Sequence, residues 1–175
     1  LVAHIKNTRT PFSIDFGVGD VIVPKQEKRK IPTQLDDFAS PTVNTYSLET
    51  TIAEKLDAIL DLMEFSSRMK DYYDIYYLAN KFDFDGATLT KALKKTFENR
   101  GHAFTIEQFE QVMAFAENEA MQKKWKAFCR KIDTKTADFN TVLKTIKEFL
   151  VEPFMAAVEN KEFEEKWTTL ESKWH

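Results

Sequence analysis

The amino-acid sequence predicts an α+β fold, in which a small β-strand unit is followed by a mainly α-helical bundle. Short runs of alternating apolar and polar residues fill the first 23 positions, which is typical of strands. From Ser47 onward, apolar residues recur at the three- and four-residue spacing of helices. Hydrophobic residues make up 43% and charged residues 30% of the chain, so the composition indicates a folded protein rather than a disordered one.

The N-terminal strands are expected in residues 2–7, 12–16 and 20–23, with turns at 8–11 and 17–19. Residues 24–41 hold three of the five prolines and are expected to form a loop. A basic cluster in this loop is interpreted as a solvated surface, with a nucleic-acid contact as the alternative.

The helices have recognisable starts and stops. Ser47, the pair 66–67 and Asp138 are expected to cap three of them. Gly86 is expected to open another helix, and Gly101 to end it.

A further long helix should start at 105–108 and continue to Ile132 or bend near Gln122. Pro153 should kink or end the helix that contains it, and Phe163, Trp167 and Leu170 suggest a last amphipathic piece. The aromatic stripes from residue 86 onward are interpreted as scaffold.

Charge and cysteine content exclude several classes of protein. A net charge of −3 argues against a surface built wholly for nucleic acid. The single cysteine, Cys129, excludes a disulfide framework within the chain and favours a reducing compartment, so the cytoplasm is expected. No apolar run approaches the ~20 residues that span a bilayer, and no membrane partner is expected.

Asp15 is the first candidate for chemistry, because it lies between apolar positions of an expected strand, where carboxylates are disfavoured. It is interpreted either as part of a half-exposed polar face or as a ligand for Mg²⁺.

Lys55 borders the apolar face of the first expected helix, between Ile52 and Leu56. Its ammonium either reaches solvent past the core or neutralises the phosphates of a nucleotide.

Arg68, Asp71 and Asp74 stand three residues apart and share one helix face. Buried carboxylates need partners, because an unpaired buried charge is costly. Asp71 is expected to pair either locally with Arg68, as Asp74 would with Lys70, or with a cation from another helix such as Lys55.

Taken in order, three segments resemble the AbiEii/AbiGii-type nucleotidyltransferase toxins. These segments are residues 12–24, residues 46–58 with Ala-Glu-Lys, and residues 67–75 with Arg-Met-Lys-Asp. The family comprises bacterial proteins of abortive-infection and toxin–antitoxin systems, similar in their core to DNA polymerase β-like nucleotidyltransferases. The resemblance spans roughly residues 12–80, and the helical remainder fits the family only in general character.

The resemblance implies roles for individual positions. Asp15 would support metal binding, Lys55 would contact the nucleotide phosphates, and Asp71 would be important for activity, so Lys55 and Asp71 are the expected catalytic residues. Arg68, Lys70 and Asp74 match further motif positions and are expected to help to bind the nucleotide.

The implied reaction transfers a nucleotidyl group from an NTP to an acceptor, with Mg²⁺ as cofactor. RNA, particularly tRNA, is the expected acceptor, and a cognate antitoxin is an expected partner.

The family's first motif, a Gly-Ser turn followed by an acidic pair, is missing, because none of the four glycines is followed by Ser. The chain is therefore expected to be a C-terminal fragment that is inactive alone. Residues 1–45 would hold the last strands and loop of the nucleotidyltransferase core, and residues 46–175 the helical domain with both motifs.

Two other hypotheses remain. In one, the chain is a degenerate fold that binds nucleotide, RNA or an antitoxin without catalysis. Alternatively, it is a structural helical domain, in which Lys55 and Asp71 would lie far apart in solvent.

Overall fold

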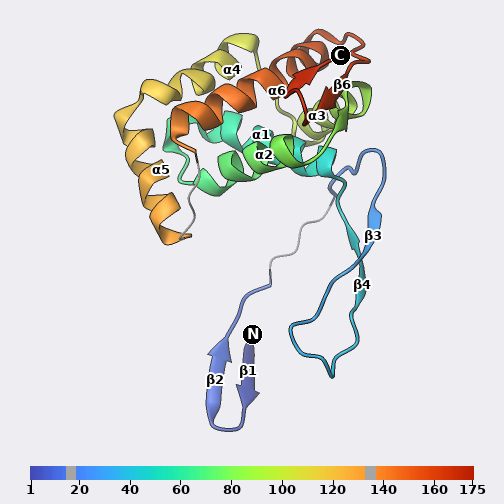
Figure 1. Cartoon of the computed structure of the whole chain (residues 1–175), viewed down its shortest axis with the longest axis vertical. Coiled ribbons are helices and arrows are strands. Elements are labelled where there is room, and N and C mark those ends of the chain that lie inside the picture. Colours follow the sequence, from blue (N-terminus) through green and yellow to red (C-terminus); the bar gives the residue numbers. More distant parts are fainter. Residues whose placement is uncertain (15–18, 133–136) are drawn as a thin grey trace.

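The structure is a computed structural model that describes residues 1–14, 19–132 and 137–175. Two antiparallel hairpins extend from a helical body (Figure 1). The strands of the two hairpins are β1 (Val2–Ile5) with β2 (Thr8–Pro11), and β3 (Glu27–Lys30) with β4 (Thr42–Thr45). The α+β class is confirmed.

Six helices form the body: α1 (Leu48–Leu62), α2 (Met69–Lys81), α3 (Gly86–Arg100), α4 (Ile106–Met113), α5 (Glu119–Lys131) and α6 (Phe139–Glu159). Helix α1 packs against α2 and α3, and the long α6 packs against the same two helices. The core between them is rich in aromatic rings, including the fully buried Tyr72, Phe149 and Phe154.

The N-terminal expectations were partly wrong. The expected turn at 8–11 is strand β2, and the expected loop at 24–41 contains β3. Residues 20–23 form no strand, because the backbone of buried Val23 bonds instead to side chains of the N-cap and first turn of α1. Its N–H donates to Thr50 Oγ1 at 2.8 Å, and its carbonyl accepts from Ser47 Oγ.

Several helix boundaries agree with the expected caps. The side chains of Ser47 and Asp138 accept bonds from backbone N–H groups of α1 and α6, and Thr105 forms a capping box with Gln108. Gly101 ends α3 at a φ of 70°. Helix α2 begins later than expected, at Met69, with no side-chain cap.

The long helix expected from residue 105 is two helices. A 3₁₀ turn, Ala114–Glu117, follows α4, and Asn118 then caps α5 by accepting from Met121 N. The break therefore lies at Asn118 rather than near Gln122, because an asparagine side chain competes well for the free N–H groups of a new helix.

Helix α6 continues through Pro153, so of the two expected outcomes, a kink or an end, the end does not occur. Proline lacks the N–H that would bond to the carbonyl of Phe149. The indole Nε1 of Trp174 donates to that carbonyl at 3.0 Å. A side chain from the C-terminal hairpin thus replaces the missing backbone donor.

The last expected amphipathic piece is a small sheet. Strand β5 (Phe84–Asp85) pairs with β6 (Lys166–Thr168), which pairs with β7 (Lys173–Trp174). Trp167 is buried and donates to the carbonyl of Ala79 at 2.8 Å, whereas Leu170 is 95% exposed at the turn. Pairing with a distant strand, rather than the local spacing of apolar residues, determines the secondary structure of this segment.

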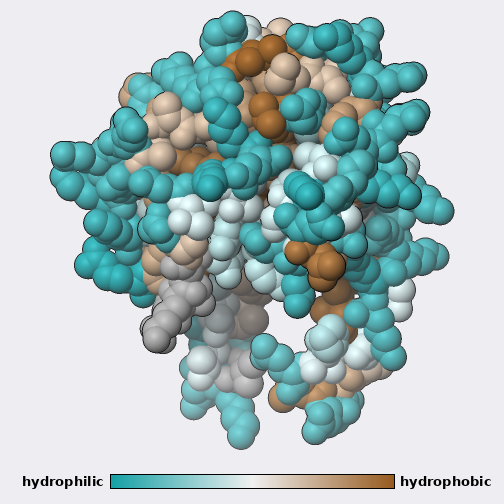
Figure 2. Space-filling view, turned by 45° about the horizontal axis from the view of Figure 1, so that its top comes forward, coloured by the Kyte–Doolittle hydropathy of each residue, from teal (hydrophilic) through white to brown (hydrophobic). Residues whose placement is uncertain are grey.

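The face shown in Figure 2 is largely hydrophilic, with smaller apolar patches between charged side chains. Among the described residues, no helix has both the length and the apolar character that a membrane span requires.

Candidate functional site

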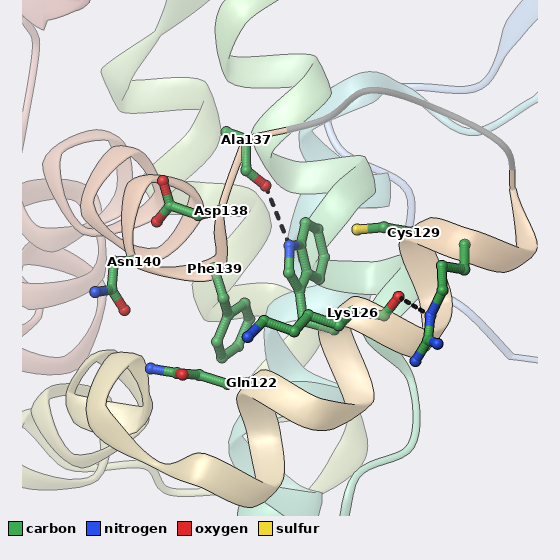
Figure 3. Close-up of a pocket in the computed structure, with 9 residues that line it drawn as sticks. Gln122, Lys126, Cys129, Ala137, Asp138, Phe139 and Asn140 are labelled. Atoms are coloured by element: carbon green, nitrogen blue, oxygen red, sulfur yellow. Dashed lines mark hydrogen bonds between the residues drawn. The ribbon is translucent and has the colours of Figure 1, made fainter.

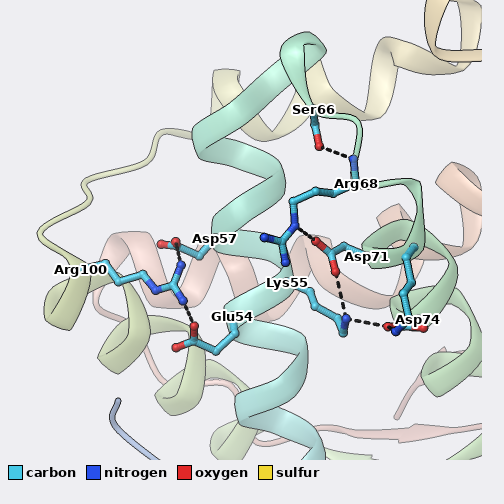
Figure 4. A network of polar contacts seen from close by, with 9 residues as sticks. Glu54, Lys55, Asp57, Ser66, Arg68, Asp71, Asp74 and Arg100 are labelled. Atoms are coloured by element: carbon cyan, nitrogen blue, oxygen red, sulfur yellow. Dashed lines mark hydrogen bonds and ion pairs between the residues drawn. The ribbon is translucent and has the colours of Figure 1, made fainter. Parts of the chain in front are cut away.

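Helices α1 and α2 bring Lys55 against two aspartates (Figure 4). The Nζ of Lys55 lies 2.9 Å from Asp71 Oδ1 and 2.6 Å from Asp74 Oδ2. Arg68 Nε lies 2.5 Å from the other oxygen of Asp71, and Lys70 Nζ lies 2.6 Å from Asp74 Oδ2. These five side chains are called the Lys55 cluster.

Local sequence explains this placement. Ile52 and Leu56 are fully buried, so Lys55 beside them is held at the edge of the core, with 16% of its side chain exposed. Asp71 lies in the first turn of α2, where the helix dipole favours a carboxylate. Its neighbour Tyr72 is fully buried, which brings Asp71 toward α1 and leaves only 5% of its side chain exposed.

The neighbouring carboxylates keep Lys55 and Arg68 protonated. Burial alone would lower the pKa of Lys55, but the hydrogen bonds and charges of Asp74 and Asp71 outweigh it and raise that pKa. The hydrogen bond and charge of Asp71 likewise raise the pKa of Arg68. Lys55 is therefore an ammonium at neutral pH, despite its partial burial.

The Lys55 cluster combines three cations with two carboxylates, so one positive charge is in excess. An ammonium has three N–H donors, and within the described residues Lys55 uses two of them on Asp71 and Asp74. Arg68 bonds through Nε and is 57% exposed, which leaves its two terminal nitrogens at the surface. The cluster can therefore bind an anion.

Both interpretations of the aspartates are realised at once. The local pairs Arg68–Asp71 and Lys70–Asp74 form, and Lys55 joins the same carboxylates from another helix. The hypothesis that placed Lys55 and Asp71 far apart in solvent is wrong about their positions.

Asp15 lies outside the described residues, so its expected place in the site stays a prediction. The chain just after it is held to the helical body, because Asn99 Nδ2 donates to the carbonyl of Gly19 at 3.1 Å.

A magnesium ion finds no complete ligand set in the described residues, which contain no group of three His, Cys, Asp or Glu side chains suited to a metal. Asp71 and Asp74 already neutralise cations and do not fit that role. The expected Mg²⁺ thus depends on Asp15 and remains a prediction.

A second network on α1 was not predicted. The carboxylate of Asp57, with 0% of its side chain exposed, lies 2.9 Å from Arg100 Nη1 and 2.8 Å from His102 Nδ1. Glu54 also pairs with Arg100. Burial raises the pKa of Asp57, while its hydrogen bond with His102 lowers it, and the balance is a raised pKa. These four side chains are called the Asp57 network.

The sequence held a weak signal for this network. Glu54 and Asp57 stand three residues apart on the first helix, and Arg100 and His102 flank the glycine that ends the third. Spacing alone does not show that α1 and α3 pack together, so the pairing could not be read in advance.

Comparison with known proteins gives one result. The family model for the nucleotidyl transferase AbiEii toxin of type IV toxin–antitoxin systems matches residues 2–168. No curated protein and no solved structure matches the chain at a significant level. The match covers most of the chain, including both hairpins and the Lys55 cluster. The chain therefore belongs to the AbiEii nucleotidyl transferase toxin family, which implies a cognate antitoxin as its partner.

Proposed function

We propose that the Lys55 cluster binds the phosphates of an NTP, and that a protein which combines this cluster with the family's Gly-Ser and acidic-pair motif transfers a nucleotidyl group from the NTP to an RNA acceptor, particularly tRNA. The observation that supports this role is the excess cation of the cluster. Two aspartates hold Lys55 at the edge of the core, while part of its ammonium and the guanidinium of Arg68 stay accessible.

Each side chain has a role in this proposal. Asp71 and Asp74 position the ammonium of Lys55, which donates its remaining N–H to a phosphate oxygen. Arg68 adds the planar fork of its terminal nitrogens, which matches two phosphate oxygens. Lys70, with 72% of its side chain exposed, adds a charge at the rim.

In the transfer, an acceptor hydroxyl oxygen bonds to the α-phosphorus, and the bond from that phosphorus to the bridging oxygen breaks. The hydroxyl proton passes to solvent, and pyrophosphate leaves. Negative charge grows on the pyrophosphate, so the cations of the Lys55 cluster stabilise the leaving group. Mg²⁺, predicted to bind with Asp15, would neutralise further phosphate charge.

Nucleotide binding tests the proposal directly. Titration with fluorescent analogues of the four NTPs should show binding that Lys55→Gln weakens by about tenfold or more, because a hydrogen bond between charged groups contributes about 1.5–3 kcal/mol. The matched control is Lys144→Gln, which removes the same charge from a side chain that is 76% exposed on α6. Equal binding by Lys55→Gln and the control would contradict the proposed site.

Transfer is tested separately, with an NTP labelled at the α-phosphate and bulk tRNA, in a protein that joins these 175 residues to the Gly-Ser and acidic-pair motif that they lack. Label should appear on the RNA, and Asp71→Asn should abolish it, since Lys55 then loses a carboxylate partner. Binding of NTP without any labelled RNA would contradict the transferase role and favour a protein that binds nucleotide without catalysis.

A further inference from the structure

Helix α5 concentrates positive charge in a chain that is acidic overall. Its 13 residues include five basic side chains and a single carboxylate, a net charge of +4, whereas the whole chain has −3. The basic residues are Lys123, Lys124, Lys126, Arg130 and Lys131. A solvated helix face explains some exposed lysines, but not such an imbalance.

A pocket of about 780 Å³ lies between α5 and the start of α6, within the size range of ligand sites (Figure 3). Its lining is mainly apolar and includes Trp125 and Phe139, whose ring centroids are 5.4 Å apart. Lys126 and Arg130, one helical turn apart, stand at its edge. The pocket thus combines an aromatic floor with a basic rim.

The charges at this rim have no ion-pair partner in the part of the chain that the structure describes. Within residues 1–14, 19–132 and 137–175, neither Lys126 nor Arg130 forms an ion pair. The Nε of Arg130 donates to the carbonyl of Lys126, which leaves its terminal nitrogens at the surface. The one carboxylate in the described lining, Asp138, caps α6 and accepts bonds from Thr141 N at 3.0 Å and Thr141 Oγ1 at 2.9 Å.

Helix α5 also touches the segment that leads into the Lys55 cluster. Lys124 Nζ donates to the carbonyls of Glu64 at 2.8 Å and Ser66 at 3.0 Å. Ser66 Oγ in turn accepts from the backbone N–H of Arg68. Lys124 lies on a different face of α5 from Lys126 and Arg130, so this contact fixes α5 to the segment before α2 and leaves the other two cations on a separate face.

We propose that Lys126 and Arg130, with the adjoining pocket, bind the phosphate backbone of single-stranded RNA. This inference rests on the proposed function and places the acceptor on α5. Phosphates pair with the cations, and an unstacked base can enter the apolar pocket beside them, the combination that single-strand binding surfaces use. An acidic protein partner would pair with the cations, but it would have no base to place in the pocket.

The test measures binding of a fluorescein-labelled oligouridylate of about 12 nucleotides by fluorescence anisotropy. The double variant Lys126→Gln/Arg130→Gln should bind about tenfold more weakly at low salt. The slope of log K against log salt should fall in magnitude by about 1.4, because each phosphate contact on a single strand contributes about 0.7.

The matched control is Lys144→Gln/Lys161→Gln, which removes two exposed charges elsewhere on the body. It should keep the affinity and slope of the parent. Equal losses in the two double variants would overturn the proposal, since only bulk charge would then matter. Equal competition by poly-glutamate would overturn the assignment to nucleic acid.

The experiments distinguish failure of the RNA site on α5 from failure of the NTP site at the Lys55 cluster. Loss of RNA binding in Lys126→Gln/Arg130→Gln, with NTP binding intact, supports the α5 site. Normal RNA binding in that variant contradicts the α5 site, whatever Lys55→Gln does to NTP binding.

Discussion

Helix α1 carries two sets of ion pairs on opposite sides, and only one of them has an excess of cations (Figure 4). The Lys55 cluster has three cations for two carboxylates. The Asp57 network has two carboxylates and Arg100, with His102 as a partner whose charge depends on its protonation. The adjacent residues Glu54 and Lys55 thus belong to different networks, and only that of Lys55 has an excess of cations.

The difference separates a structural network from a binding site. In the Asp57 network the carboxylate is fully enclosed, and Arg100 and His102 join the end of α3 to α1. That network has no excess cation with which to attract an anion. In the Lys55 cluster the carboxylates are the buried part, and Arg68 and Lys70 point cations outward. We therefore expect substitutions in the Asp57 network to lower the stability of the fold. Substitutions in the Lys55 cluster should also lower the affinity for nucleotide.

The largest expected effect comes from Asp57→Ala. Removing one partner of a buried ion pair leaves the other unpaired, and we expect a loss of about 3 kcal/mol in the free energy of unfolding, measured by urea denaturation. Asp61→Ala is the control, because Asp61 is 54% exposed and lies 3.7 Å from the same histidine. Equal losses in both variants would show that burial of Asp57 does not matter.

Asp71→Asn should cost about 2 kcal/mol of unfolding free energy, because two cations lose a charged partner. It should also weaken NTP binding, since Lys55 is then held by Asp74 alone. Asp74→Asn should cost less, because its side chain is more exposed. A larger effect of Asp74→Asn, by denaturation and nucleotide titration, would reverse the assigned order of the two aspartates.

Alkaline pH should weaken the Lys55 cluster. The folded protein raises the pKa of Lys55 above its unfolded value of about 10.4, so the stability from its charge is complete below that pH. It is lost as pH rises through the higher folded pKa. The stability difference between the parent and Lys55→Gln should therefore stay constant from about pH 7 to 10 and shrink above about 10.4. A difference that shrinks already below about pH 9 would contradict the raised pKa.

The smallest expected effect on stability is that of Lys70→Ala, within about 0.5 kcal/mol, because exposed ion pairs contribute little. Its NTP affinity should still fall about twofold to threefold, through the lost rim charge. Unchanged affinity, measured in the same titration, would confine the phosphate site to Lys55 and Arg68.

The sequence predicted the helix ends that depend on interactions between neighbouring residues. Ser47, Thr105 and Asp138 mark helix starts because their side chains bond to nearby N–H groups, and Gly101 marks an end because it adopts a positive φ. The pairing of Lys55 with Asp71 was foreseen as one of two options, because both residues border apolar faces that must pack together.

Contacts between distant residues were not predictable. Trp167 faces the core because its strand pairs with Phe84, far away in the sequence, and periodicity within residues 163–170 cannot show this. Arg100 meets Asp57 only because α3 packs on α1. The bond that Asp74 shares between Lys70 and Lys55 likewise depends on the packing of α2 against α1.

The indole that bonds to the carbonyl opposite Pro153 has a practical consequence for handling this protein. Trp174 completes the hydrogen bonding of a helix from outside it, and it stands one residue from His175. Removing the chain from Trp174 onward would therefore disturb the middle of α6, not only a surface hairpin.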